Sequence, residues 1–160
     1  MPLKRSQITM TDAEMQTFYD EERIVTCATI GPNGRPHLMP LWYVVDGGRI
    51  AGWTFGKSQK VRNLERRPEA TLQIEAGRDQ YAALRGVMLE CDVEIVRDPA
   101  AVEAIGIALA RRYGGLPAGA PLPPAALANV QKQSPKRVGL RFHPTRVVSW
   151  DHRKLGGGGY

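Results

Sequence analysis

The chain has 160 residues, of which 42% are hydrophobic and 24% are charged, and its formal net charge at pH 7 is +6. This length and composition are typical of a globular protein with its own hydrophobic core, and they exclude an intrinsically disordered chain. No apolar run reaches the roughly 20 residues of a membrane-spanning helix, and the first residues lack the pattern of a secretion signal, so we expect no membrane span and a cytoplasmic protein.

We expect one domain over residues 1–160, with flexible ends at residues 1–11 and 156–160. The second of these ends contains a run of glycines, a composition that favours flexibility. Cys27 and Cys91 both lie in apolar strand patterns. We therefore expect two reduced core thiols rather than a disulfide or a metal site.

The first regular element is a helix over residues 12–20. Thr11 and Glu14 form a T-x-x-E capping box at its start, and Met10 and Met15 occupy the two positions of a hydrophobic staple.

Strands follow this helix. Residues 24–30 read I-V-T-C-A-T-I, as in a buried strand, and G-P-N-G at 31–34 predicts a hairpin turn. A return strand over 35–45 and a third strand over 49–55 complete the expected antiparallel meander. This order is not a βαβ unit, and no G-x-G-x-x-G motif is present, so the sequence argues against a Rossmann fold.

The segment from Trp53 to Pro68, W-T-F-G-K-S-Q-K-V-R-N-L-E-R-R-P, carries the clearest functional signal. Gly56 ends the third strand, Ser58 takes the N-cap of a short helix, and Pro68 ends that helix. Unpaired N–H groups at a helix start favour anions, and nearby lysines add positive charge. The segment therefore predicts a binding site for a phosphorylated cofactor.

The positive net charge also permits a nucleic-acid partner. However, the basic residues cluster around the Ser58 helix, and none of the usual nucleic-acid-binding motifs is present. We therefore favour a small acidic ligand and expect no nucleic acid.

The rest of the chain predicts more strands and two more helices. The strands are expected at residues 70–75, 86–97, 137–143 and 146–151, and the helices at 99–113 and 125–133. The segment from Leu116 to Pro124 is rich in Pro, Gly and Ala, which favours an irregular connection. Many short antiparallel strands with a few peripheral helices indicate a mainly β (α+β) fold that closes into a barrel.

Three stretches give the chain a family resemblance: A-T-I-G-P-N-G-R-P-H-L-M-P-L-W-Y-V-V-D-G-G-R-I, then S-Q-K-V-R-N-L-E-R-R-P, then L-R-G-V-M-L-E-C-D-V-E-I-V-R-D-P. In this order and spacing they resemble the pyridoxamine 5′-phosphate oxidase-like split β-barrel superfamily. The closing P-T-R-V-V-S-W-D-H-R-K-L is similar to its branch of flavin/deazaflavin oxidoreductases, the F-420-dependent members. The match covers nearly the whole chain from Asp12.

The resemblance implies an antiparallel split β-barrel of the FMN-binding type and a homodimer with a cofactor groove between the subunits. Its S-x-K-x-x-N-L segment implies that the cofactor phosphate is held by Ser58, Lys60 and Asn63, with Lys57 adjacent. The residues that it implies along the cofactor ring are Met39, Pro40, Leu41, Trp42, Trp53 and Thr54. The C-terminal candidates are Trp150, Arg153 and Lys154, in the same subunit or from the partner.

Each of these features has a structural alternative. The polar residues around Ser58 can simply cap and solvate a helix, and Trp42 and Trp53 can pack in the core rather than form an aromatic wall. A set of arginines at 62, 66 and 67 either forms a solvated face or contacts an acidic tail, because F-420 carries a phosphodiester and a poly-glutamate tail. His37 and His143 are expected to be structural, and His152 is a candidate ligand contact.

The implied activity is that of an F-420-dependent oxidoreductase, which transfers a hydride between reduced deazaflavin and an unsaturated organic small molecule. No Ser-His-Asp or paired-carboxylate pattern stands out, which fits an enzyme whose cofactor carries the chemistry. Water or Tyr43 is the proton source to consider, and no catalytic residue is assigned. The substrate and the direction of transfer stay open.

Other functions are also compatible with the sequence. They are an FMN-dependent oxidase or reductase of the same fold, a pyridoxal-phosphate-type oxidase with a second phosphate clamp, and a non-enzymatic protein that binds a cofactor or haem. The residues alone favour F-420 over FMN only through their surplus of positive charge.

Overall fold

The computed structural model describes residues 5–156. The helices are α1 (Arg5–Ile8), α2 (Asp12–Glu21), α3 (Gln59–Arg66), α4 (Pro99–Tyr113) and α5 (Pro124–Gln133), with short 3-10 turns η1 (Tyr81–Ala83), η2 (Ser134–Lys136) and η3 (His152–Leu155). The strands are β1 (Val25–Ile30), β2 (Pro36–Leu41), β3 (Val44–Asp46), β4 (Arg49–Phe55), β5 (Glu69–Ala76), β6 (Arg85–Val96) and β7 (Arg137–Asp151).

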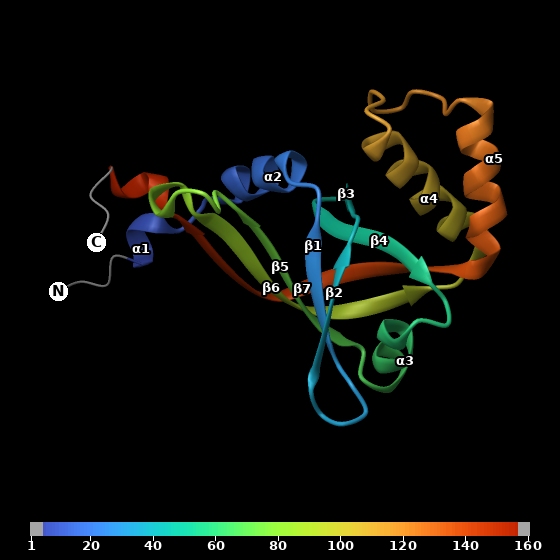
Figure 1. The fold of residues 1–160 in the computed structure, drawn as a ribbon, viewed down its shortest axis with the longest axis horizontal. Coiled ribbons are helices and arrows are strands. Elements are labelled where there is room, and N and C mark those ends of the chain that lie inside the picture. The colour runs from blue at the N-terminus through green and yellow to red at the C-terminus, as the bar shows by residue number, and fades with distance from the viewer. Residues whose placement is uncertain (1–4, 157–160) are drawn as a thin grey trace.

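The strands form one antiparallel seven-stranded sheet in the order β2-β1-β5-β6-β7-β4-β3. The sheet curls around a core that includes Val25, Cys27, Leu72, Leu140 and Phe142 (Figure 1). Both cysteines are buried free thiols, as predicted. The mainly β (α+β) split-barrel fold expected from the sequence is confirmed.

The expected closure of the barrel is wrong. Strands β2 and β3 are the two edges of the sheet, and within residues 5–156 they do not pair with each other. The barrel is therefore open along one side, and this opening is where the candidate site described below lies.

The predicted meander over residues 24–55 is correct in its two antiparallel hairpins, β1–β2 and β3–β4, but wrong in joining them through one return strand. The expected return strand is divided into β2 and β3, which lie at opposite edges of the sheet. The division falls at Trp42 and Tyr43, because the Tyr43 hydroxyl is buried and donates to the carbonyls of Tyr19 (2.7 Å) or Glu22 (2.9 Å). The chain crosses from the β2 edge of the sheet to the β3 edge at Trp42, close to Gly52 of β4. Only a glycine fits at position 52, since a Cβ there would lie 2.8 Å from the Trp42 carbonyl oxygen.

The two strands expected at 137–143 and 146–151 are one strand, β7. Pro144 falls between the two expected strands, but it lies within β7 opposite Cys91 of β6. The pairing register shifts next to it, so that Thr145 is skipped and Arg146 faces Glu90. Such a bulge accommodates a residue without an N–H donor inside a strand.

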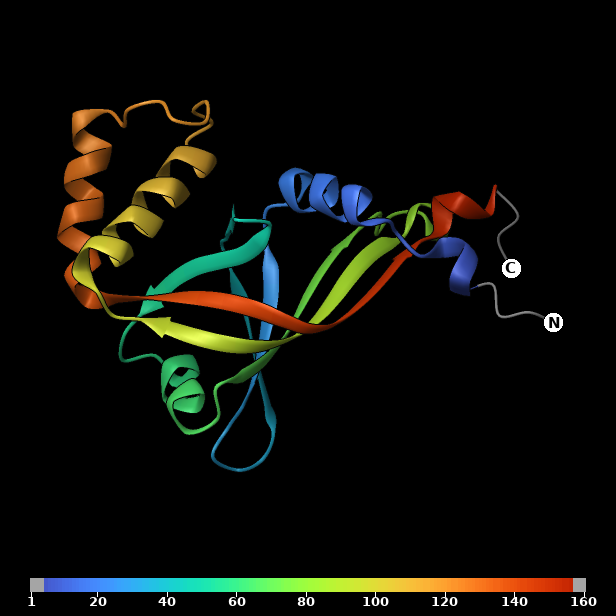
Figure 2. The same cartoon turned by 180° about the vertical axis from the view of Figure 1, so that it is seen from behind.

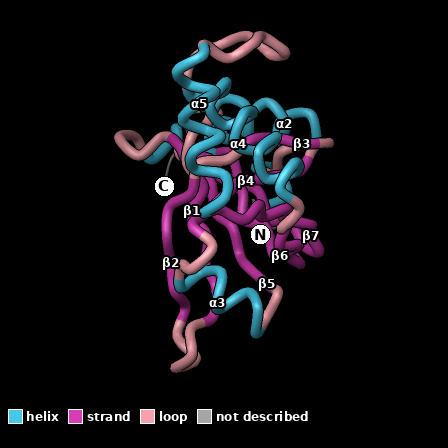
Figure 3. The backbone as a smooth tube through the Cα atoms, turned by 90° about the vertical axis from the view of Figure 1, so that its right-hand side faces the viewer, coloured by secondary structure: helices cyan, strands magenta, loops and turns pink. Residues whose placement is uncertain are grey.

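The long strands β6 and β7 extend from the barrel toward the end of the molecule that is farthest from α4 and α5, where α1, η1 and η3 lie (Figures 1 and 2). Helices α4 and α5 pack together as a pair at the other end, and α3 lies below the barrel (Figure 3). None of the helices between residues 5 and 156 is long and apolar enough to cross a membrane.

The N-terminal signals worked as predicted. The Thr11 hydroxyl accepts from the Glu14 N–H, and the Glu14 carboxylate accepts from the Thr11 N–H, which completes the capping box of α2. The predicted flexible ends fall partly on residues 1–4 and 157–160, which lie outside the described residues. Between them and the domain, Arg5–Ile8 forms α1 and Met10 is buried, with its N–H donating to the Ser149 hydroxyl (2.9 Å).

Candidate cofactor site at the opening of the barrel

A pocket of about 520 Å³ lies at the opening of the barrel, beside the start of α3. Eight of the residues proposed from the sequence line it: Met39, Pro40, Leu41, Trp42, Trp53, Thr54, Ser58 and Lys60. Four lining residues were not proposed: Ile24, His37, Gln59 and Arg137. We call this space the main pocket. It brings β2, β4, β7 and α3 together at one place.

Helix α3 begins as the sequence predicts. Ser58 is its N-cap, and the Ser58 hydroxyl accepts a hydrogen bond from the Val61 N–H (3.4 Å). The helix buries Val61 and Leu64 in the core. The first turn lines the main pocket with Ser58, Gln59 and Lys60. At the start of a helix the first backbone N–H groups, here those of residues 59 and 60, have no acceptor within the helix itself.

Lys60 is the main electrostatic feature of the pocket. It is only 5% exposed, and no hydrogen bond or ion pair to its ammonium is formed within residues 5–156. Loss of hydration on burial lowers the pKa of Lys60, and the nearby Cys27 thiol acts in the opposite direction. A lysine held in this way is a cation without a counter-ion, and an anion in the pocket would supply one.

Two more nitrogen atoms of pocket-lining side chains have no hydrogen-bond partner in the part of the chain that the structure describes. The Arg137 guanidinium lies over the ring of Trp53, 5.4 Å from its centroid, and its buried Nε forms no hydrogen bond. The buried Nδ1 of His37 also lacks a partner among the described residues. Three side chains around this mostly apolar pocket, Lys60, His37 and Arg137, thus each carry a nitrogen atom without a hydrogen-bond partner among the described residues.

The two tryptophans proposed as an aromatic wall are held by α4. Trp53 packs against Gly106, where an added Cβ would lie 2.4 Å from the indole ring. Trp42 is 57% exposed, and its ring stacks on Tyr113 with centroids 4.1 Å apart and planes at 5°. Trp53 is therefore also a packing residue, whereas Trp42 is not in the core.

A second space, which we call the basic hollow, adjoins the main pocket through Arg137. It measures about 570 Å³ and is lined by Phe55, Gly56, Lys57, Arg97, Pro135, Lys136, Arg137 and Val138. Arg97 forms an ion pair with Glu65 (2.5 Å). Lys57 and Lys136 are exposed and form no ion pair within the described residues.

Asn63 does not reach either space. It is fully buried, and its amide donates to the Thr29 hydroxyl of β1 (3.0 Å) while its carbonyl oxygen accepts from Gln59 and Arg66 (both 2.8 Å). The structure thus places Asn63 where it fastens α3 to the sheet. Arg67, one of the three arginines considered for an acidic tail, instead pairs with Glu69.

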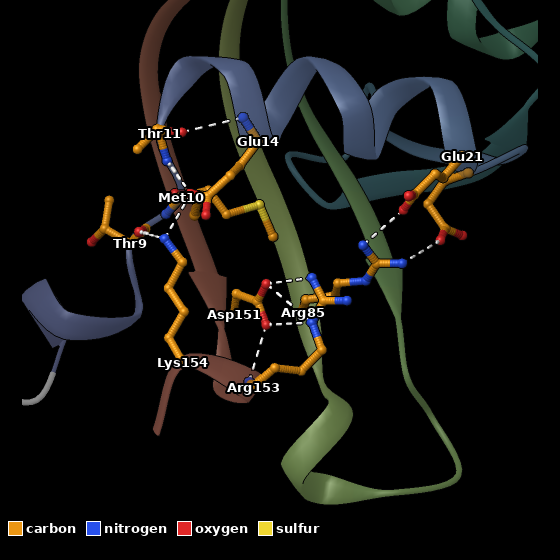
Figure 4. Close-up of polar contacts among 11 residues, drawn as sticks. Thr9, Met10, Thr11, Glu14, Glu21, Arg85, Asp151, Arg153 and Lys154 are labelled. Atoms are coloured by element: carbon orange, nitrogen blue, oxygen red, sulfur yellow. Dashed lines mark hydrogen bonds and ion pairs between the residues drawn. The ribbon is translucent and has the colours of Figure 1, made fainter. Parts of the chain in front are cut away.

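Of the C-terminal candidates, Trp150 lies near the end of β7, and Arg153 and Lys154 lie in η3, which follows it (Figure 4 labels the last two). Arg153 pairs with the buried Asp151 (2.6 Å), and its hydrogen bonds lower the pKa of that carboxyl. Lys154 donates to the Glu14 carboxylate (2.6 Å) and the Thr9 carbonyl (2.8 Å). Trp150 packs against Gly86. None of the three lines the main pocket of its own chain.

Two titratable candidates from the sequence are also distant or engaged. Burial raises the pKa of Tyr43, whose hydroxyl is already donated to backbone carbonyls, so it is not available as a proton source. His152 lies in η3 at the far end, with Nδ1 3.2 Å from the Tyr81 carbonyl oxygen.

The missed residues differ in whether the sequence held a signal for them. His37 alternates with Met39 and Leu41 along β2, so the period of a strand places all three on one face. Arg137 had no such local signal. It faces Phe55 across the β4–β7 pair, a contact between residues 82 positions apart that only the sheet order creates.

An open antiparallel barrel with a short helix below its opening is the architecture of the pyridoxamine 5′-phosphate oxidase-like split barrels. The chain belongs to this family of flavin-binding oxidoreductases, since the family model described as pyridoxamine 5′-phosphate oxidase matches residues 11–151. A comparison with curated proteins gave no match.

Solved structures agree with this family. The conserved hypothetical protein Rv2991 from Mycobacterium tuberculosis is 42% identical with a TM-score of 0.87, over 98% of this chain and 94% of that one. An F-420 reductase is 26% identical with a TM-score of 0.60, over 82% of this chain and 94% of that one. HutZ, the haem storage protein from Vibrio cholerae, shares the fold at 17% identity and a TM-score of 0.66, over 86% of this chain and 93% of that one.

Proposed function

We propose that this protein is an F-420-dependent oxidoreductase that transfers a hydride between reduced deazaflavin and an unsaturated organic small molecule. The observation that carries the proposal is that the buried residue Lys60 lines the main pocket and its ammonium has no partner among the described residues. Burying a charge without a partner is costly, and a phosphate group beside Lys60 would offset that cost.

The residues of the main pocket fit a flat, phosphorylated cofactor. Lys60, the free N–H groups at the start of α3 and the Ser58 O–H can all donate to phosphate oxygens. The adjoining wall from Met39 to Trp42, together with Trp53, is apolar and suits a planar ring. When bound, the deazaflavin supplies the hydride chemistry, and the chain binds it, orients it and shields it from water.

The basic hollow favours F-420 over FMN. FMN ends at its phosphate, whereas F-420 continues into a tail with several carboxylates. Lys57 and Lys136 lie next to the proposed phosphate site and form no ion pair within residues 5–156, and Arg137 borders both spaces. We assign the acidic tail to this hollow rather than to the outer face of α3. The F-420 reductase among the similar structures supports the same choice.

We also propose a homodimer with the cofactor groove at its interface. Strand β2 is an edge strand, and its side chains Leu38 and Met39 are 57% and 45% exposed. Within one chain the C-terminal candidates at 150, 153 and 154 lie far from the main pocket, so a contact with the cofactor requires a second subunit. The mass of one chain is 17.6 kDa, and light scattering of the protein is expected to give twice this mass. A monomer that binds F-420 at full affinity would contradict the dimeric arrangement.

The test of the proposed function is a fluorescence titration of the protein with F-420 and, in parallel, with FMN. We expect saturable binding of F-420 and weaker binding of FMN. The double variant Lys57→Ser/Lys136→Ser is expected to weaken F-420 binding more than FMN binding, because only F-420 has a tail for the basic hollow. Preference for FMN would identify an FMN-dependent oxidase or reductase, and binding of neither would overturn the phosphate assignment.

A further inference from the structure

Trp42 is an unusual pocket residue because most of its side chain is exposed, at 57%, yet its ring is held in one orientation. An exposed tryptophan on a chain crossing would ordinarily sample several rotamers. Here the indole lies almost parallel to the ring of Tyr113, 4.1 Å away and inclined by 5°. This is stacking rather than incidental contact, and Tyr113 therefore limits where the indole can lie.

Tyr113 is itself fixed at both ends. Its ring packs against the cluster formed by Val44, Ala51 and neighbouring residues of α4. Its hydroxyl accepts from the Tyr43 N–H (3.0 Å) and donates to the Arg23 carbonyl (2.6 Å). The phenol thus joins the last turn of α4 to the entry of β1 and to the crossing from β2 to β3.

The neighbouring residue strengthens the same junction. The Arg112 guanidinium donates to the carbonyls of Tyr19 (2.7 Å) and Glu22 (2.8 Å) at the end of α2, and it lies 4.9 Å from the centre of the Tyr43 ring. The end of α4 is therefore anchored independently of Trp42, which makes Tyr113 a fixed surface for the indole.

We infer that Tyr113 is a positioning residue, which acts through Trp42 to set the shape of the main pocket where the cofactor ring binds. This inference rests on the proposed function, because the ligand whose binding it affects is the flavin or deazaflavin. It assigns a role in the site to α4, an element that contributes no lining residue to the main pocket.

A double-mutant cycle tests the inference with F-420 and FMN as probes. Tyr113→Leu is expected to weaken the binding of the preferred cofactor by about 2- to 10-fold, as the loss of an aromatic pair implies. In a Trp42→Leu background the same substitution is expected to have no further effect. An equal loss in both backgrounds would overturn the inference, because Tyr113 would then act without Trp42.

Tyr113→Phe is the matched control, since it loses the two hydroxyl hydrogen bonds and keeps the ring. We expect a lower melting temperature but cofactor affinity close to that of the wild type. A loss of affinity equal to that of Tyr113→Leu would show that the hydroxyl junction, not the stacking, is what matters. If Tyr113→Leu fails to fold, Tyr113→Met takes its place in the cycle, because its longer side chain fills more of the space left by the ring while still removing the stacking.

A second readout needs no cofactor. The contribution of Trp42 to acrylamide quenching is the difference in tryptophan emission between the wild type and Trp42→Leu. Tyr113→Leu is expected to increase that contribution, and Tyr113→Phe is expected to leave it unchanged. If the wild type binds neither cofactor, the proposed function fails while this readout still decides whether Tyr113 orients Trp42; unchanged quenching in Tyr113→Leu would overturn the inference.

Discussion

Replacement of Lys60 by methionine is expected to stabilise the protein while removing its affinity for the cofactor. Lys60 as a residue is 5% exposed, and its ammonium has no hydrogen bond or ion pair in the described part of the chain. An unpaired buried charge costs up to several kcal/mol, and we take about 1–3 kcal/mol here because the side chain borders an open pocket. At about 2–4 °C per kcal/mol for a chain of this size, Lys60→Met is expected to melt about 2–12 °C higher.

The same substitution removes a charged donor from the phosphate. A hydrogen bond to a charged group contributes about 1.5–3 kcal/mol, so the dissociation constant for F-420 is expected to rise by about 10- to 150-fold. Thermal unfolding and fluorescence titration measure the two effects separately. The matched control is Lys132→Met on α5, an exposed lysine outside both spaces, which is expected to change neither quantity appreciably.

The stability difference between the wild type and Lys60→Met is expected to change with pH in a defined direction. The pKa of Lys60 is lowered in the folded protein from its ordinary value of 10.5. The unfolded chain therefore binds more protons between the two pKa values, and the stability of the wild type rises with pH in that window. The advantage of Lys60→Met is thus complete below the folded pKa and shrinks as the pH approaches 10.5. A variant that melts lower than the wild type at pH 7, or that binds F-420 normally, would refute the reasoning.

Three further substitutions test the packing around the site. Gly106→Ala places a Cβ 2.4 Å from the Trp53 ring, so we expect a loss of about 1–3 kcal/mol and altered tryptophan emission, and an unchanged melting curve would contradict that packing. Asn63→Ala leaves the buried Thr29 hydroxyl without its donor and is expected to lower the free energy of unfolding in urea by about 1–3 kcal/mol; a neutral result would show that α3 is held otherwise. The ionised carboxylate of Asp151 stabilises the wild type above pH 3.8, and this contribution is lost as the pH falls through the lowered pKa of Asp151. Asp151→Asn is expected to remove the contribution, so equal acid-unfolding curves of the two proteins would exclude it.

The candidate site was predictable where local chemistry defines it. The rules for helix starts predict Ser58 as an N-cap and an anion-binding site beside it, to which Lys60 adds positive charge. The structure places both residues beside the main pocket. The same segment misled at Asn63, which has the same polar character but faces the sheet and bonds to Thr29. Sequence spacing gave the helix, but the direction of each side chain on that helix depends on what α3 packs against.

The features of the fold likewise fall into those that local sequence determines and those that tertiary packing determines. The capping box at Thr11, the turns and the strand periodicity are local, because they depend on backbone conformation and on contacts between near neighbours in sequence. The sequence by itself therefore determined nearly every helix and strand. It did not determine that residues 35–45 divide at Trp42, that Pro144 lies within a continuous strand, or that the barrel stays open between β2 and β3. Those features depend on strand order and on contacts such as the Tyr43 hydroxyl on the end of α2, which join residues far apart in the chain, and tertiary packing alone decides them.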